Sequence, residues 1–288
     1  MSKFIRFESN STENYQASYN KVKGEVDYCY FVPPNKKKVC VDIGSNMGAF
    51  IHRMSEEDAF EEIYGFEPSF QTYHASLSIL GELDILNPSR RIFNLAVADK
   101  TGEIYTLFDG GDGDSGCASL LPSQKSTQKE NCMSISLDDI FDLAQVDYID
   151  YLKIDCEGAE LGILQNSKRL GDIGAMMVEC HYVDGVDTTP YIIKILNANG
   201  FHVNCFKATE DVEGTSHADR MKGVEPVLFA VDAKKYQEDY SGWYRLGVVD
   251  EEETKVSIGD IEKHNNGRHN EYKEACERNQ NVQQKETI

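Results

Sequence analysis

From Lys38 onward, short apolar runs alternate with segments of helical length, and this alternation limits the possible folds more than any other feature of the chain. It is typical of βαβ units, which build an open parallel sheet with right-handed crossovers and helices on both faces. The expected strands are VCVDI (39–43), IYGFEP (63–68), RIFNLAVAD (91–99), YIDYLKIDC (148–156), AMMVECH (175–181), FHVNCFKA (201–208) and PVLFAVD (226–232). We therefore predict a doubly wound α/β fold with a mostly parallel seven-stranded sheet. Its last strand is expected to be antiparallel because only a short irregular link precedes it.

Local signals place some of the boundaries between these strands. Ser69 follows Pro68 and can cap the free amides of a helix that runs through SFQTYHASLSILGEL. Gly200 is placed to end the helix TPYIIKILNANG. The alternating segment EIYTLF, after the turn KTG, is expected to add a hairpin strand.

The composition of the chain divides it into three parts. Residues 1–37 are polar with interspersed aromatic side chains and are expected to be an N-terminal extension. Residues 38–249 carry the strand and helix pattern and are predicted to form one domain. Residues 250–288 are charged and poor in apolar side chains, so we expect a tail that is disordered or loosely helical.

Charge and cysteine usage exclude several classes of protein. A net charge of −20 opposes binding to bulk nucleic acid or to anionic membranes. The apolar runs are too short to span a bilayer and the first residues lack a secretory signal, so we expect a soluble, cytoplasmic protein. The eight cysteines are isolated from one another, which favours reduced core residues over a zinc site or a disulfide framework.

Two strand ends carry residues suited to a nucleotide-like cofactor. The segment Asp42-Ile-Gly44-Ser-Asn46-Met-Gly48 follows the first strand, where glycines allow close backbone approach to a ligand. Its spacing does not fit the G-x-G-x-x-G of dinucleotide folds, and the carboxylate of Asp42 suits a ligand that bears an ammonium group. Glu67 ends the second strand, where a carboxylate can accept hydrogen bonds from ribose hydroxyls.

A set of motifs in this order resembles the FkbM-type methyltransferases: VDIGSNMGAF, IYGFEPS, NLAVADKTGE, SISLDDI, YLKIDCEGAELGIL and MMVECH. The resemblance covers about residues 39–232, and LKIDCEGAE is its most specific part. It implies a Rossmann-like class I methyltransferase fold that binds S-adenosylmethionine. It also implies that Asp42, Gly44, Asn46 and Gly48 line the methionine end of the cofactor, that Glu67 binds the ribose, and that Ala98 and Asp99 lie near the adenine.

The catalytic candidates lie on the fourth and fifth predicted strands. Lys153 and Asp155 point to the same face of their strand, so an ion pair is plausible there. Glu157 and Glu160 also favour the start of the next helix electrostatically. Asp155 by its position, and His181 by its near-neutral pKa, are both candidates for the base that accepts a proton. With Glu179 in the adjacent E-x-H motif, the predicted catalytic set is Asp155, His181, Lys153 and Glu179.

A divalent cation held by Asp155, Glu179 and His181 is the less favoured alternative for activating the acceptor. The resemblance implies O-methylation of a hydroxyl on a sugar, a glycan or another small natural product. A loop over about residues 109–130 is expected near the acceptor, and Ala118-Ser119-Leu120 lies where the family has a serine-rich turn. The competing hypothesis is a catalytically silent cofactor-binding or scaffolding protein that keeps the same fold.

Overall fold

The computed structural model describes residues 15–16, 18–19, 31–109, 118–122, 128–206, 227–234, 243–249 and 252–257 of the 288-residue chain. The glycine-rich part of the predicted 109–130 loop lies outside these residues, as does the greater part of both predicted end segments. The division of the chain at residues 37 and 249 therefore stays a prediction.

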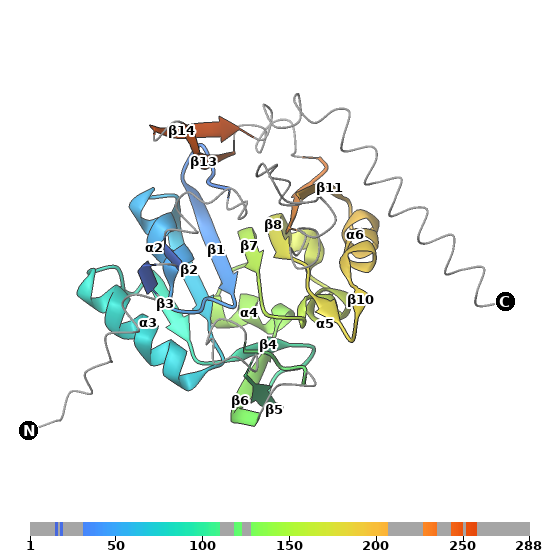
Figure 1. The fold of residues 1–288 in the computed structure, drawn as a ribbon. Helices are drawn as coiled ribbons and strands as arrows, with labels where there is room; N and C mark the ends of the chain where they lie inside the picture. Colours follow the sequence, from blue (N-terminus) through green and yellow to red (C-terminus); the bar gives the residue numbers. More distant parts are fainter. Residues whose placement is uncertain are drawn as a thin grey trace, which may run out of the picture.

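A seven-stranded sheet forms the centre of the molecule, with the strand order β11-β12-β8-β7-β1-β2-β3 (Figure 1). Its strands are β1 (Lys37–Ile43), β2 (Phe60–Phe66), β3 (Arg90–Phe93), β7 (Ile149–Ile154), β8 (Ile173–Glu179), β11 (Phe201–Phe206) and β12 (Val227–Asp232). Neighbouring strands are parallel except at β12, which is antiparallel to both β8 and β11. The predicted doubly wound, mostly parallel sheet with an antiparallel last strand is confirmed.

β1 lies at the middle of this sheet and positions the residues that follow the strands. Asp42 of β1 is paired in register with Lys153 of β7 on one side and with Gly65 of β2 on the other. Because these strands are parallel, their carboxyl ends meet at one edge of the sheet. The residues singled out from the sequence at three different strand ends are thereby brought to the same edge.

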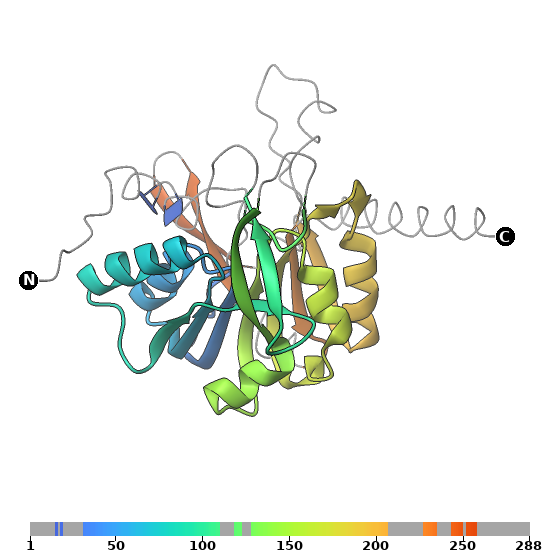
Figure 2. The same ribbon diagram turned by 90° about the horizontal axis from the view of Figure 1, so that it is seen from below.

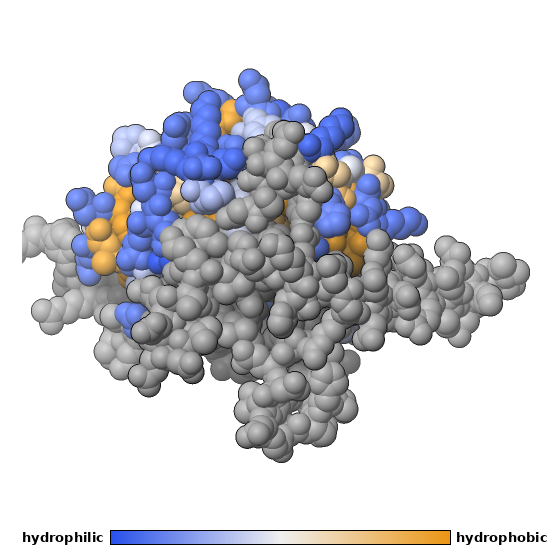
Figure 3. All heavy atoms as spheres, turned by 90° about the horizontal axis from the view of Figure 1, so that it is seen from above, coloured by the Kyte–Doolittle hydropathy of each residue, from blue (hydrophilic) through white to orange (hydrophobic). Residues whose placement is uncertain are grey.

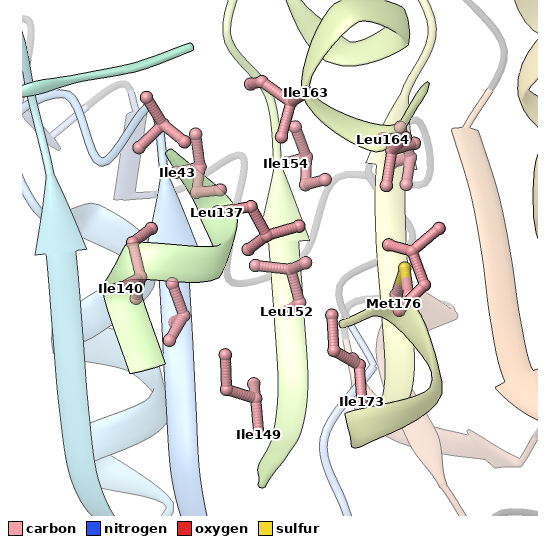
Figure 4. Close-up of a cluster of buried hydrophobic side chains, with 14 of the residues drawn as sticks. Ile43, Leu137, Ile140, Ile149, Leu152, Ile154, Ile163, Leu164, Ile173 and Met176 are labelled. Atoms are coloured by element: carbon pink, nitrogen blue, oxygen red, sulfur yellow. The ribbon is translucent and has the colours of Figure 1, made fainter. Parts of the chain in front are cut away.

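Helices cover both faces of the sheet, as a doubly wound fold requires. One face packs against α4 (Leu137–Ala144), α5 (Glu160–Asn166) and α6 (Thr189–Ala198), through the cluster of buried side chains in Figure 4. The other face packs against α2 (Ala49–Glu56) and α3 (Phe70–Glu82). A short 3₁₀ helix, Leu170–Asp172, precedes β8. The apolar runs of the central strands are continuous because both of their faces are buried.

Aromatic side chains complete the face that carries α2 and α3. Trp243 is fully buried, and its ring lies 4.8 Å from that of Tyr151 and 5.7 Å from that of Phe229. Phe31 also packs against Phe229, at 4.6 Å between ring centroids. Side chains from before β1 and from after β12 therefore close the core around β7, β8 and β12.

The predicted strand RIFNLAVAD (91–99) is wrong as a single strand. β3 ends at Phe93, and β4 (Ala96–Ala98) belongs to a separate sheet of order β4-β6-β5, with β5 (Ile104–Phe108) and β6 (Gln128–Ser136). The side chain of Asn94 donates hydrogen bonds to the carbonyls of Glu67 and Pro68, both at 2.9 Å, at the point where the chain leaves the main sheet. Figures 1 and 2 show the small sheet at the carboxyl-end edge of the main one. The predicted added strand is present as β5, but the hairpin expected from the turn KTG is wrong, because β5 pairs with β6 and not with the preceding β4.

The predicted helix boundaries hold where the signals are local. Ser69 is the N-cap of α3 and its hydroxyl accepts from the amide of Thr72. Gly200, with φ +87°, follows the end of α6. A short hairpin of β9 (Tyr182–Val183) and β10 (Val186–Asp187) connects β8 to α6.

A second hairpin, β13 (Tyr244–Val249) and β14 (Glu252–Ser257), crosses the predicted end of the domain. Glu252–Ser257, which falls in the predicted tail, pairs with β13 along its length. The prediction for the rest of the tail lies outside the described residues.

One face of the molecule shows mainly hydrophilic side chains among the described residues that are visible on it (Figure 3). Seen from above, it shows polar side chains with separate apolar patches between them (Figure 3). Within the described part of the chain, none of the helices has the length and apolar character needed to cross a bilayer.

Trp243→Ala is expected to lower the free energy of unfolding by about 3–5 kcal/mol, because it opens a cavity between Tyr151 and Phe229. Denaturant unfolding followed by circular dichroism measures the change. Trp243→Phe keeps an aromatic ring and should lose markedly less. Emission from this single tryptophan of the chain should be that of a buried indole in the wild type. A loss below about 1 kcal/mol in the alanine variant would show that the residue does not complete the core.

Candidate active site

The turn after β1 has a backbone that glycine makes possible at two positions. Gly44 has φ +76°, and a Cβ built on it would lie 1.7 Å from the carbonyl oxygen of Asp155. Gly48 has φ +85°, and a Cβ there would lie 2.6 Å from Leu80 Cδ1. Asn46 between them also has a positive φ, +47°. The turn therefore packs directly against the end of β7 and against α3, with no room for side chains at its two glycines.

Glu67 fastens this turn to the start of α3. Its side chain is buried; Oε2 accepts from the amide of Asn46 at 3.0 Å and Oε1 from the amide of Ser69 at 2.8 Å. A carboxylate has further lone pairs, so these two bonds leave capacity for ribose hydroxyls. The predicted neighbours Asn46 and Glu67 are thus brought together, and Glu67 has a structural contact that the sequence did not indicate.

Two polar atoms of the turn suit a bound ligand. Ser45 Oγ and Asn46 Oδ1 are buried and make no hydrogen bond to any other described residue. Buried polar atoms are normally hydrogen-bonded in native proteins. Together with the carboxylate of Glu67, these atoms fit the polar groups of a nucleoside that carries an amino acid. Ser45 was not among the residues predicted from the sequence.

A buried row of alternating charges lies behind the turn. Lys153 Nζ is 3.0 Å from Asp42 Oδ1 and 3.4 Å from Asp155 Oδ2, and it donates to the carbonyl of Gly44 at 3.1 Å. Burial disfavours the charge on Lys153, but Asp42 and Asp155 outweigh that effect and raise its pKa. The predicted pair of Lys153 with Asp155 is present. Asp42, predicted at the methionine end of the cofactor, is fully buried and faces Lys153.

A second charged group surrounds His181 at the end of β8. Its Nδ1 lies 2.8 Å from Glu160 Oε1 and its Nε2 lies 3.5 Å from Glu157 Oε2. Burial disfavours the charged ring, but the hydrogen bond to Glu160 and the neighbouring carboxylates raise the pKa of His181 to about 11. The near-neutral pKa on which we based its role as a base does not hold in this environment.

Glu160 has a structural role beyond the electrostatic effect on the helix start that we predicted for it. Besides His181, its Oε1 accepts from the amides of Cys156 and Gly158, both at 3.1 Å. The carboxylate therefore stabilises the turn between β7 and α5 by accepting hydrogen bonds from two of its amides. Ser119 donates to the carbonyl of Glu157 at 2.5 Å, which docks residues 118–122 on the same turn. The LKIDCEGAE motif contains Glu160 and its two amide partners, but His181 lies 21 residues further along the chain, too far for spacing to reveal that contact.

The remaining predicted residues are Ala98, Asp99 and Glu179, and the charge of Glu179 contributes to the raised pKa of Lys153. Ala98 is buried in β4, and Asp99 accepts a hydrogen bond from Tyr105 at the surface. Their place near the adenine stays a prediction. Glu179 is half-buried at the end of β8, whereas the side chains whose ligand atoms come within 4.8 Å of one another are Asp155, Glu157 and His181.

A glycine turn after β1, a carboxylate after β2 and a charged group after β7 and β8, on a sheet of this order, define a class I S-adenosylmethionine-dependent methyltransferase. The family model for the methyltransferase FkbM domain matches residues 42–203, more than half of the chain. The chain therefore belongs to the FkbM methyltransferase family, and its cofactor is S-adenosylmethionine.

The chain is also similar to solved structures at low sequence identity. The FkbM methyltransferase of Methylobacillus flagellatus KT is 16% identical, with a TM-score of 0.47, over 76% of this chain and 52% of that one. TrmK of M. capricolum, solved with S-adenosylhomocysteine, is 10% identical, with a TM-score of 0.42, over 79% of this chain and 69% of that one. No curated protein matches the chain.

Lys153→Met is expected to lower the free energy of unfolding by about 3–5 kcal/mol, because it leaves the carboxylate of Asp42 buried without its cation. The double variant Lys153→Met with Asp42→Asn removes both charges and should recover the greater part of the loss. Denaturant unfolding of the two variants and the wild type measures this. Equal losses in the single and double variants would mean that the ion pair is not the source of the effect.

Proposed function

We propose that this methyltransferase transfers the methyl group to a hydroxyl of a sugar, a glycan or another small natural product. The observation that carries the proposal is the carboxylate of Asp155, which is 22% exposed beside the cofactor turn while Lys153 holds one of its oxygens. A hydroxyl acceptor must lose its proton during the transfer, and a fixed carboxylate at this place can take it.

Ser45, Asn46 and Glu67 would hold the cofactor through hydrogen bonds at the turn. When bound, S-adenosylmethionine supplies a methyl group already activated by the sulfonium charge. The task left to the protein is to align the acceptor and to accept its proton. The acceptor would lie beside the partly exposed carboxylate of Asp155, next to the turn.

Asp155 suits the proton acceptor better than His181 does. His181 is almost fully buried, and its two ring nitrogens face Glu160 and Glu157, which favour the protonated ring. An imidazolium has no lone pair with which to take a proton. We therefore assign His181, Lys153 and Glu160 to positioning the charged groups, and Asp155 to proton transfer.

The alternative is a catalytically silent protein that binds the cofactor and recruits partners. Both hypotheses predict binding of S-adenosylhomocysteine, so binding alone does not separate them. A methyl-transfer assay separates them. The protein is incubated with S-adenosylmethionine and a panel of sugars, glycans and small hydroxylated and amine compounds, and mass spectrometry detects methylated products. Methylation confined to amines would overturn the O-methyl proposal, and no methylation in a broad panel would favour the silent protein.

Glu67→Gln should weaken S-adenosylhomocysteine binding by about 1.5–3 kcal/mol, or about 10- to 150-fold, because a neutral amide replaces a charged acceptor of the ribose hydroxyls. Isothermal titration calorimetry measures the dissociation constant. Glutamine is preferred to alanine because it keeps the side-chain volume and one acceptor for the amides of Asn46 and Ser69. Glu61→Gln, exposed at the other end of β2, is the control and should bind as the wild type does.

Asp155→Asn should lower kcat by about 10²- to 10⁴-fold, the usual contribution of a general base. Affinity for S-adenosylhomocysteine should change by less than about 2-fold, since the backbone of residue 155 that faces Gly44 is retained. Steady-state assays on an acceptor found in the panel provide the measurement. Asp147→Asn, exposed before the opposite end of β7, serves as the control. An Asp155→Asn enzyme that keeps wild-type kcat would exclude this residue as the base.

A further inference from the structure

Three side chains of the acceptor region have the arrangement of a cation site. Asp155, Glu157 and His181 each offer one ligand atom, and these atoms all lie within 4.8 Å of one another. Metal–ligand bonds of about 2.1 Å place opposite ligand atoms about 4.2 Å apart, so a small side-chain rotation closes the set around a cation. Two ligands come from the turn after β7 and one from the end of β8.

The imidazole of His181 is oriented by a buried carboxylate, as metal-binding imidazoles usually are. Its Nδ1 contacts the carboxylate of Glu160 at 2.8 Å, and Glu160 is itself fully buried. Histidines that bind metals usually donate their second nitrogen to such a carboxylate, which fixes the ring. Nε2, the nitrogen left for a cation, is directed at the carboxylate of Glu157. This buried carboxylate and imidazole distinguish the site from a surface group of acids.

The charges around the site favour a cation. Asp155, Glu157 and Glu160 bring three carboxylates together, while the nearby Lys153 is shared with Asp42. Glu160 Oε2 is buried and has no hydrogen-bond partner within the described residues. Binding of a cation to Nε2 of His181 releases the proton that these carboxylates otherwise hold on the ring. Asp155 and Glu157 are 22% and 28% exposed, so one side of the site is open.

We propose that Asp155, Glu157 and His181 bind one divalent cation of the Mn²⁺ class, with Glu160 as the residue that orients the imidazole. Two carboxylates and one imidazole suit Mn²⁺ and related first-row ions, whereas Ca²⁺ prefers six to eight oxygen ligands. This ligand set differs from the one expected from the sequence, because Glu157 replaces Glu179.

The role of the cation in catalysis rests on the proposed function. A hydroxyl coordinated at the open side of the site loses its proton more readily, because the cation stabilises the negative oxygen that forms. The proton passes to the oxygen of Asp155 that does not bind the cation, and the oxygen–methyl bond forms as the sulfur–methyl bond of S-adenosylmethionine breaks, which leaves S-adenosylhomocysteine. No electron is exchanged with the cation.

The test measures Mn²⁺ binding to the full chain by electron paramagnetic resonance, without cofactor or acceptor. We expect one Mn²⁺ to bind more tightly than the background of surface acids, and pulsed spectra to show coupling to an imidazole nitrogen. Glu157→Gln should weaken this binding at least about 10-fold and Glu160→Gln about 10- to 100-fold. Glu61→Gln, at the opposite edge of the sheet, and Glu179→Gln should bind as the wild type does.

Several outcomes would overturn the cation site. These are the lack of Mn²⁺ binding above background, binding without nitrogen coupling, or binding that depends on Glu179 and not on Glu157. His181→Gln should abolish the nitrogen coupling. If that variant fails to fold, the Mn²⁺ affinity of Glu157→Gln, a change at a partly exposed side chain, and the nitrogen coupling of the wild type still test the site.

The two proposals fail independently. Hydroxyl methylation that continues in excess chelator, by a protein that binds no Mn²⁺, would overturn the cation site and leave the proposed function intact. Specific Mn²⁺ binding by a protein that methylates no hydroxyl would overturn the proposed function and leave the cation site intact.

Discussion

The close approach of the Gly44 turn to the end of β7 is the contact on which the rest of the site depends. With 1.7 Å between a notional Cβ and the carbonyl oxygen of Asp155, only glycine permits it. The amides of Gly44 and Ser45 are tied to the carbonyl of Phe66 on the other side, at 3.0 Å each. The ends of β7, β1 and β2 are thereby locked in one row. Cofactor groups and proton-accepting groups can be neighbours because these three backbones touch.

Charge is arranged along the same row in a way that a stable core alone would not require. Replacing a buried ion pair by apolar residues is often neutral or stabilising, so the Asp42–Lys153 pair is weak evidence for stability. Its consequence is local: Lys153 is held at a fixed place, and it in turn holds one oxygen of the exposed Asp155. Glu160 fixes His181 in a similar way. The buried charges of Lys153 and Glu160 therefore explain the orientation of Asp155 and His181.

Sequence patterns predicted what depends on near neighbours. The period of two along β7 places Lys153 and Asp155 on one face, and Ser69 caps α3 through an amide three residues away. Sequence patterns failed where a residue distant in the chain determines the strand pairing or the environment of a side chain. Ala96–Ala98 continues an apolar run but pairs with Ser134–Ser136 in another sheet. The environment of His181 is set by Glu160, which lies 21 residues earlier in the chain, so the pKa of the ring could not be inferred from the E-x-H motif.

Parts of the chain outside the matched family domain also support this site. The match ends at residue 203, yet β12 and Trp243 complete the sheet and its core. At the other end, the rings of Tyr15 and Tyr19 pack in one cluster with Met47 of the cofactor turn, and Tyr19 stacks on His52 of α2 at 4.4 Å. Met47 is buried under this cluster. The turn is thus supported from inside by Glu67 and from outside by the N-terminal tyrosines, so its positive-φ backbone is fixed from two sides before any ligand binds.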